Sequence, residues 1–252
     1  MPQASKTPVL EVCVDDPQGL SAAVSGGADR VELCSALALG GLTPSPGLIA
    51  AAAELAVPVF AMIRPRPGGF VYSPEELTVA KADIAAVRNA GLAGIVLGVT
   101  HPDGRLDREA IGGLRDAAGD LPMVLHRAFD LSPDLDEGLE TAIELGFCRI
   151  LTSGGAPSAI EGAGNIARLA QQARGRITIM AGGGVDAGNA AELLRAGADD
   201  LHGSCSDIRA DQDMGGRLRI ASERAQTSVA RIRALRAAME RATIEQTGEK
   251  TS

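Results

Sequence analysis

Short runs of apolar, often β-branched residues alternate along the chain with longer stretches of helical period. This alternation is typical of repeated βα units, in which each strand is followed by a helix that covers a parallel sheet. Glycines stand where several of these helices should end, as the turn from a helix to a strand requires: Gly27, Gly91, Gly146 and Gly197. The pattern predicts eight strands, at residues 10–14, 30–34, 58–63, 94–99, 123–127, 149–153, 177–181 and 200–203.

Eight units of near-even length predict an α/β fold closed into a TIM (β/α)8 barrel, as a single domain over residues 8–242. The 252 residues of the chain match the length that one such barrel needs. A doubly wound open sheet is the rival, but no Gly-x-Gly-x-x-Gly motif follows the first predicted strand. In a barrel, chemistry is expected in the loops at the C-terminal ends of the strands.

The segment 205–227 separates the last predicted strand from the last helix by more than an ordinary βα loop. Two interpretations stay open: a lid above the barrel mouth, or a disordered surface excursion. In the last helix Val229, Ile232, Leu235 and Met239 share one face, which predicts a packed helix. Residues 243–252 are predicted to form a flexible tail.

Composition narrows the class of partner. A net charge of −8 disfavours nucleic acid and anionic membranes, and no apolar run is long enough to span a bilayer. The chain has no Trp and only one Tyr and four Phe, so it lacks the aromatic platform on which single-stranded nucleic acid stacks. The first residues do not have the order of a secretory signal, which predicts a cytoplasmic protein whose four cysteines are thiols.

Two acidic residues stand inside the apolar runs of the first two strands. Glu11 and Glu32 each share a strand face with a cysteine, Cys13 and Cys34. A carboxylate is too costly against the helical layer, so we expect both pairs to point into the barrel. The candidate catalytic cluster at the strand ends comprises Glu11, Glu32, Arg64, His126, Arg127 and Asp130. An ion-pair network that only closes the barrel is the structural alternative.

Glycine-rich loops follow the last three strands. Backbone amides in these loops, and the helix N-termini after them, commonly bind a phosphate or another anion in barrels. The predicted anion-binding residues are Ser153, Gly154, Gly182, Gly183, Gly184, His202 and Ser204. These glycines could equally do no more than permit tight turns.

Three thiols stand at the ends of strands that neighbour one another in a closed barrel. Cys13, Cys34 and Cys205 end the first, second and eighth strands, so the sequence predicts a candidate thiolate site for Cu(I) or Zn(II). The alternative is that all three are small buried hydrophobic residues, since there is no Cys-x-x-Cys motif. Cys148 precedes the sixth strand, at the opposite end, and is expected to be structural.

Several sequence blocks, in order, make the chain resemble the CutC copper homeostasis family. They are Leu10-Glu11-Val12-Cys13, Gly27-Ala28-Asp29-Arg30-Val31-Glu32-Leu33-Cys34, Gly40-Gly41-Leu42-Thr43-Pro44-Ser45, Ile63-Arg64-Pro65-Arg66, His126-Arg127-Ala128-Phe129-Asp130, Leu151-Thr152-Ser153-Gly154 and Ile179-Met180-Ala181-Gly182-Gly183-Gly184-Val185. The resemblance implies a cytoplasmic TIM barrel that forms a homodimer or higher homo-oligomer and binds Cu(I) through Cys13 and Cys34. Cys205 departs from the family pattern.

Two functions follow from these residues. The first is a copper homeostasis protein that binds Cu(I) as a thiolate complex. The second is an enzyme that uses a carboxylate or His126 in acid/base chemistry on a small anionic carbonyl or sugar-like substrate, bearing a phosphate or carboxylate. Copper binding by two thiols makes no demand on Glu11, Glu32 or Arg64, which an enzyme would be expected to have, so it leaves those residues unexplained. A third interpretation is a barrel that serves as an interaction scaffold and binds neither metal nor ligand.

Overall fold

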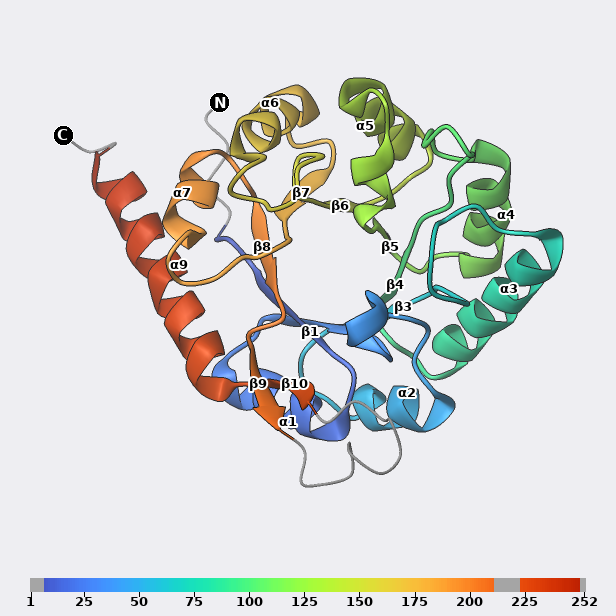
Figure 1. Cartoon of the computed structure of the whole chain (residues 1–252), viewed down its shortest axis with the longest axis horizontal. Coiled ribbons are helices and arrows are strands. Elements are labelled where there is room, and N and C mark those ends of the chain that lie inside the picture. Colours follow the sequence, from blue (N-terminus) through green and yellow to red (C-terminus); the bar gives the residue numbers. More distant parts are fainter. Residues whose placement is uncertain (1–6, 211–222, 250–252) are drawn as a thin grey trace.

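The computed structural model describes residues 7–210 and 223–249, and these form a closed ring of eight parallel strands surrounded by helices (Figure 1). The predicted TIM barrel is therefore confirmed, with each strand within a few residues of its predicted bounds. The barrel strands are β1 Leu10–Val14, β2 Arg30–Leu33, β3 Val59–Met62, β4 Gly94–Leu97, β5 Met123–Leu125, β6 Arg149–Thr152, β7 Thr178–Ala181 and β8 Asp200–Gly203.

The outer layer consists of α-helices with two short 3₁₀ helices between them. They are α1 Pro17–Gly26, η1 Leu37–Leu39, α2 Pro46–Ala53, α3 Pro74–Asn89, α4 Arg108–Ala118, η2 Arg127–Leu131, α5 Leu135–Glu144, α6 Ala163–Ala173, α7 Ala190–Arg195 and α9 Val229–Glu249. Helix α9 packs against α7 and α1 and so completes the outer ring (Figure 1). None of the helices in the described part of the chain is long and apolar enough to cross a membrane.

Three of the helices begin with the same local signal, an N-cap side chain followed by proline. Asp16, Ser45 and Ser73 each accept a hydrogen bond from a backbone N–H of the first turn, and a proline occupies the first helical position. Proline fits there because its missing N–H is one that the helix does not use. The sequence therefore places the start of each helix locally.

Strand residues alternate between the helical layer and the barrel interior. Leu10, Val12 and Val14 pack outward in the large core between strands and helices. A separate inner cluster fills the middle of the barrel, formed by Cys34, Phe60, Met62, Val96, Val124, Leu151 and Met180. A polar network lies at the N-terminal end of this cluster, and Glu11 links it to His202 at the open C-terminal mouth.

The polar network below this inner cluster is a set of buried ion pairs. Arg30 binds the carboxylate of Glu11 and lies 3.1 Å from Asp200 Oδ2 through Nη2, while Arg149 Nε lies 3.2 Å from the same oxygen. The guanidinium groups of Arg30 and Arg149 also lie 5.8 and 5.4 Å from the ring centroid of Phe60. The expectation that Glu11 and Glu32 point inward is thus correct, since both are buried inside the ring.

The segment between β8 and α9 is not simply the long loop predicted for 205–227. Its ends pair as an antiparallel hairpin of β9 Ser206–Ala210 and β10 Glu223–Thr227, and Arg224 of β10 reaches Asp16 at 3.3 Å. Residues 211–222, on which the choice between a lid and a disordered excursion depends, lie outside the described residues. The predicted tail from residue 243 is also revised, because α9 remains helical to Glu249.

Candidate functional site

A cavity of about 410 Å³ opens at the C-terminal end of the barrel, where the fold class predicts the site. Its wall carries charged and polar side chains from five strand ends and from the hairpin after β8. The candidates from the sequence analysis that line it are Cys13, Glu32, Arg64, His126, Arg127, Gly183, Gly184, His202 and Ser204. Asp15 and Asp16, which the sequence analysis did not name, add two carboxylates to the same lining.

His202 lies between two carboxylates. Its Nδ1 lies 2.8 Å from Glu11 Oε1, and its Nε2 lies 3.8 Å from Glu32 Oε2. The strand register explains the arrangement, because Glu11 of β1 is paired with both His202 of β8 and Arg30 of β2. Glu11 therefore fixes the orientation of the imidazole, so that Nε2 faces the mouth side of the barrel.

These contacts shift the ionisation of all three groups. Burial lowers the pKa of His202, but Glu32, Cys13 and Glu11 outweigh it and raise the pKa well above its usual range. Burial raises the pKa of Glu11, yet Arg30 and His202 bring it down to about 2. For Glu32 burial prevails and its pKa is raised, although His202 opposes the change. Neighbouring carboxylates in one barrel thus differ in proton affinity, which is the usual condition for acid/base work.

Cys13, Glu32 and His202 form a possible metal-binding group. One ligand atom from each lies within 4.8 Å of the other two, and all three residues are buried. Within residues 7–210 and 223–249 this is the one group of three or more His, Cys, Asp or Glu with that property. Thiolate and imidazole suit copper or zinc, and the hydrogen bond that His202 Nδ1 donates to the Glu11 carboxylate is the usual support of a histidine ligand.

The three thiols do not form the predicted site together. Cys34 is fully buried in the inner apolar cluster, where its thiol donates to Glu32 Oε2 at 3.5 Å. Burial, with Glu32, raises the pKa of Cys34 well above its usual range. Cys205 belongs to the outer core, beside Leu235 of α9, and burial together with Cys13 raises its pKa to about 11. Cys13 alone of the three lines the cavity.

Arg64 and His126 line the same cavity, and Phe70 contacts both. The Phe70 ring lies 4.6 Å from the His126 ring, and the Arg64 guanidinium lies 5.2 Å from the Phe70 centroid. Burial, helped by Arg64, lowers the pKa of His126 to about 3, so this imidazole is neutral at physiological pH. Arg64 Nε, His126 Nε2 and Glu32 Oε1 are buried atoms with no hydrogen-bond partner in the described protein.

Asp130 has a different role from the catalytic one predicted. Its carboxylate accepts hydrogen bonds from Arg127 Nε at 2.8 Å, from the Ser153 amide at 3.1 Å and from the Gly155 amide at 3.1 Å. The Gly154 amide binds Thr152 Oγ1 at 2.8 Å. The amides of the Ser153-Gly154 loop are thus occupied by the protein's own groups, so we revise the prediction that they bind an external anion.

Of the three glycines after β7, only two line the cavity. The Gly182 amide donates to the Thr152 carbonyl at 2.9 Å, and Gly182 does not line the cavity. Gly183 and Gly184 do line it, with φ of 102° and 79°, a region in which a side chain would be strained. A Cβ on Gly183 would also lie 3.2 Å from Arg127 Nη1. These two glycines keep the backbone close to the cavity.

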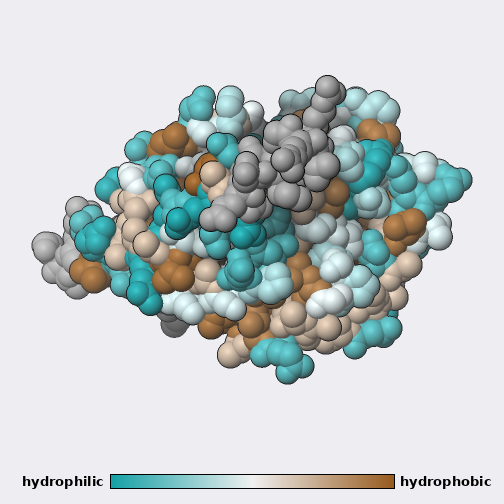
Figure 2. All heavy atoms as spheres, turned by 60° about the horizontal axis from the view of Figure 1, so that its bottom comes forward, coloured by the Kyte–Doolittle hydropathy of each residue, from teal (hydrophilic) through white to brown (hydrophobic). Residues whose placement is uncertain are grey.

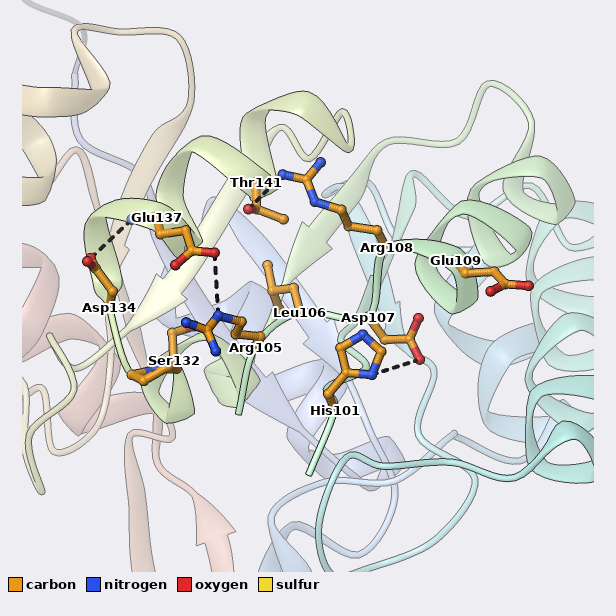
Figure 3. Close-up of a pocket in the computed structure, with 12 residues that line it drawn as sticks. His101, Arg105, Leu106, Asp107, Arg108, Glu109, Ser132, Asp134, Glu137 and Thr141 are labelled. Carbon is orange, nitrogen blue, oxygen red and sulfur yellow. Dashed lines mark hydrogen bonds and ion pairs between the residues drawn. The ribbon is translucent and has the colours of Figure 1, made fainter. Parts of the chain in front are cut away.

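A second pocket, of about 420 Å³, lies outside the barrel between the starts of α4 and α5 (Figure 3). Its charged groups pair with each other across exposed surface: Arg105 with Glu137 at 3.5 Å, and His101 with Asp107 at 3.8 Å. Arg108 donates to Thr141 Oγ1 at 3.0 Å. Because these groups are already paired with one another, they are less available to a ligand. The mouth cavity is therefore the better candidate for the functional site.

Sequence reasoning missed the residues below the site. Arg30 and Asp200 occur two residues before Glu32 and His202, so the strand period of two already indicated that they face the interior. Phe70 carried no such signal, because it lies in the loop between β3 and α3. Its contacts with Arg64 and His126 depend on how that loop folds back.

Comparisons with known proteins agree on one family. Residues 8–207 match the model of the CutC family. A CutC family protein of Sinorhizobium medicae (strain WSM419) is 54% identical over 237 residues, which cover 92% of this chain and 96% of the relative. The human copper homeostasis protein cutC homolog is 44% identical over 216 residues, covering 85% of this chain and 78% of that protein.

A solved structure is similar as well. The crystal structure of a CutC protein from Streptococcus agalactiae matches with a TM-score of 0.75 and 36% sequence identity. The match covers 78% of this chain and 98% of that chain.

Proposed function

The chain belongs to the CutC family, and we propose that it is a copper homeostasis protein that binds Cu(I) at the mouth of its barrel. The name of the human relative supports a role in copper handling. The observation that carries the proposal is the group of Cys13, Glu32 and His202, with ligand atoms within 4.8 Å of one another. Cu(I) prefers soft sulfur and accepts imidazole nitrogen, so Cys13 and His202 would be its main ligands.

The three thiols are not equally suited to bind Cu(I). Cys13 lines the cavity, whereas Cys34 is a buried thiol whose raised pKa opposes the loss of its proton. Cys205 faces the outer core. Both Cys13 and His202 must give up a proton to bind the metal, so affinity should rise with pH. The reducing cytoplasm, which we propose as the location, keeps all four cysteines as the free thiols seen here.

An anaerobic Cu(I) titration in competition with bicinchoninate tests this function. We expect one tight site per chain, which Cys13→Ser weakens by at least about a hundred-fold and His202→Gln by at least about ten-fold. Cys148→Ser and Cys205→Ser are the controls, one exposed at the far end and one buried in the outer core. Equal affinity in Cys13→Ser and Cys205→Ser would overturn the proposal.

We propose as a second candidate an enzyme that acts by acid/base chemistry on a small anionic carbonyl or sugar-like substrate. A specific observation favours it: Glu32, Arg64 and His126 line one cavity, and each has a buried polar atom with no hydrogen-bond partner among residues 7–210 and 223–249. Glu32, with its raised pKa, would be the proton acceptor. A thermal shift with sugar phosphates or carboxylates that is lost in Glu32→Gln supports this function, and no shift with any of them contradicts it.

We also propose that the protein forms a homo-oligomer. On the face shown in Figure 2, hydrophobic side chains occur in small groups separated by hydrophilic ones. Light scattering of the eluted protein tests the oligomer, and a monomeric mass contradicts it.

The partner of the mouth cavity would be the metal ion or a small anion. The net charge of −8 disfavours nucleic acid and anionic membranes, so we propose neither as a partner.

A further inference from the structure

Arg64 is a buried cation without a counter-ion. It is 6% exposed and forms no ion pair within the described residues, although it lines the mouth cavity. Its Nη1 donates to the carbonyls of Leu39 and Gly41 at 2.9 and 3.0 Å, and its Nη2 donates to the Gly68 carbonyl at 2.7 Å. These bonds fix the guanidinium in place but leave its charge uncompensated.

The nearby hydroxyl of Tyr72 does not supply the missing charge. Burial raises the pKa of Tyr72 even though Arg64 opposes that change, so the phenol stays neutral. A buried cation is usually paired with a carboxylate or a phosphate. An anionic ligand in the cavity would therefore neutralise the buried charge of Arg64.

His126 offers that anion a hydrogen-bond donor. The Ala128 amide donates to His126 Nδ1 at 3.1 Å, so Nδ1 carries no proton and the proton of the neutral ring is on Nε2. Nε2 is the buried atom that has no partner in the described protein. His126 is thus an N–H donor, held beside the positive charge of Arg64 by their common contact with Phe70.

Glu32 offers the opposite capacity, an acceptor. Its Oε2 accepts the Cys34 thiol at 3.5 Å, whereas its Oε1 is buried with no donor in the described protein. An unpaired carboxylate oxygen favours a ligand with a hydroxyl group. The lining of one cavity therefore includes a positive charge, an N–H donor and a hydroxyl acceptor.

From these three groups we infer that the mouth binds a small hydroxycarboxylate, with its carboxylate on His126 and Arg64 and its hydroxyl on Glu32. The inference deepens the second candidate function by naming its ligand class, and it does not depend on copper binding. The cavity of about 410 Å³ is within the range of small-ligand sites. Arg127 also lines the cavity, and its Nη1 has no acceptor in the described protein. It could therefore bind a second polar group of a longer hydroxycarboxylate.

Glycolate is the appropriate probe, because it is the smallest hydroxycarboxylate and has no stereochemistry. Acetate lacks its hydroxyl and ethylene glycol lacks its carboxylate, so the three form a matched set. The full chain, freed of metal with a chelator and labelled with ¹⁵N-histidine, gives signals from only three histidines, His101, His126 and His202. We expect His126 to show the neutral Nε2–H tautomer and to shift saturably with glycolate.

Acetate should bind at least about five-fold more weakly than glycolate, and ethylene glycol should cause no shift, because each lacks one of the two interactions. Glu32→Gln should reduce the preference for glycolate over acetate, and Arg64→Gln should weaken both anions by at least about ten-fold. His101→Asn is the control, since His101 lies on the outer surface beside Asp107. If Arg64→Gln does not fold, His126→Asn tests the same carboxylate contact, and glycolate binding to that variant is followed at the signal of His202, which lines the same cavity.

The inference is overturned if glycolate up to about 100 mM gives no saturable shift at His126, or if glycolate and acetate bind equally well. It is also overturned if Glu32→Gln and His126→Asn leave glycolate binding unchanged. Because the protein is metal-free, these outcomes do not depend on the Cu(I) titration. Glycolate binding without turnover of any hydroxycarboxylate would refute the enzyme function and leave the binding site standing.

Discussion

Replacing His126 with asparagine should remove a specific part of the acid sensitivity of the protein. Burial, with Arg64, lowers the pKa of His126 from 6.5 to about 3 in the folded chain. In the unfolded chain the residue returns to its ordinary pKa. Between pH 6.5 and about pH 3, the imidazole is therefore protonated in the unfolded chain and neutral in the folded chain. The stability linked to His126 is therefore fully present above pH 6.5 and is lost as the pH falls toward 3.

The size of the effect follows from the width of this window. Each pH unit inside it costs about 1.4 kcal/mol of unfolding free energy for one group. Between pH 6.5 and about pH 4.5 the folded protein should lose about 3 kcal/mol through His126 alone. His202 does not cancel this loss, because its pKa is raised: its contribution is fully present below pH 6.5 and disappears only as the pH rises.

Urea unfolding at half-unit steps from pH 7 to pH 4.5 measures the effect. At pH 7 His126→Asn should be less stable than wild type, since the ring contact with Phe70 is lost. Below pH 6.5 the difference should shrink by about 1.4 kcal/mol for each unit of acidification, because the variant lacks the linked proton. His101→Asn, on the exposed surface, should run parallel to wild type. If His126→Asn also runs parallel to wild type, the neutral buried imidazole is refuted.

Three further predictions test other parts of the molecule. Glu11→Gln should cost about 3–5 kcal/mol at pH 7 by urea unfolding, since Arg30 and His202 lose a buried partner, and a loss under about 1 kcal/mol would contradict the ion network. Gly104→Ala should cost at least about 2 kcal/mol, because φ is 87° and a Cβ would lie 2.1 Å from the Leu131 carbonyl oxygen; Gly47→Ala, with nothing within 4 Å, should be neutral or stabilising, and equal effects would be inconsistent with the strain. Asp130→Ala should cost about 2–4 kcal/mol of stability, because Arg127 and the amides of Ser153 and Gly155 lose their acceptor, and a variant of unchanged stability would return Asp130 to the catalytic residues.

The barrel could be read from the sequence because its signals are local and repeated. Each strand is a short apolar run, helices α1 to α5 begin at a capped proline or a capping aspartate, and the period of two assigns strand faces. That period put Glu11 and Glu32 on one face with a cysteine, and the cost of a carboxylate against the helical layer placed that face inside the ring. It failed to place Cys205, because the chain leaves β8 there with a left-handed φ of 45° and turns the thiol outward.

The details of the site depend on contacts between distant residues. The N–H donor of His126 follows from a bond to the Ala128 amide, and the charge of Arg64 is uncompensated only because its neighbours are carbonyls. Asp130 was predicted to be catalytic because it follows the fifth strand with His126 and Arg127, yet it is engaged by the loop after β6. Residue type and strand position gave the candidates, and the loops decided their roles.

X-ray absorption at the copper edge of the Cu(I)-loaded protein tests the central claim most directly, namely that the metal is held by Cys13 with His202 and not by a set of thiols. We expect one sulfur scatterer with one or two nitrogen or oxygen scatterers in wild type, and loss of the sulfur in Cys13→Ser. Two or three sulfur scatterers in wild type would contradict the account and return Cys34 or Cys205 to the metal site.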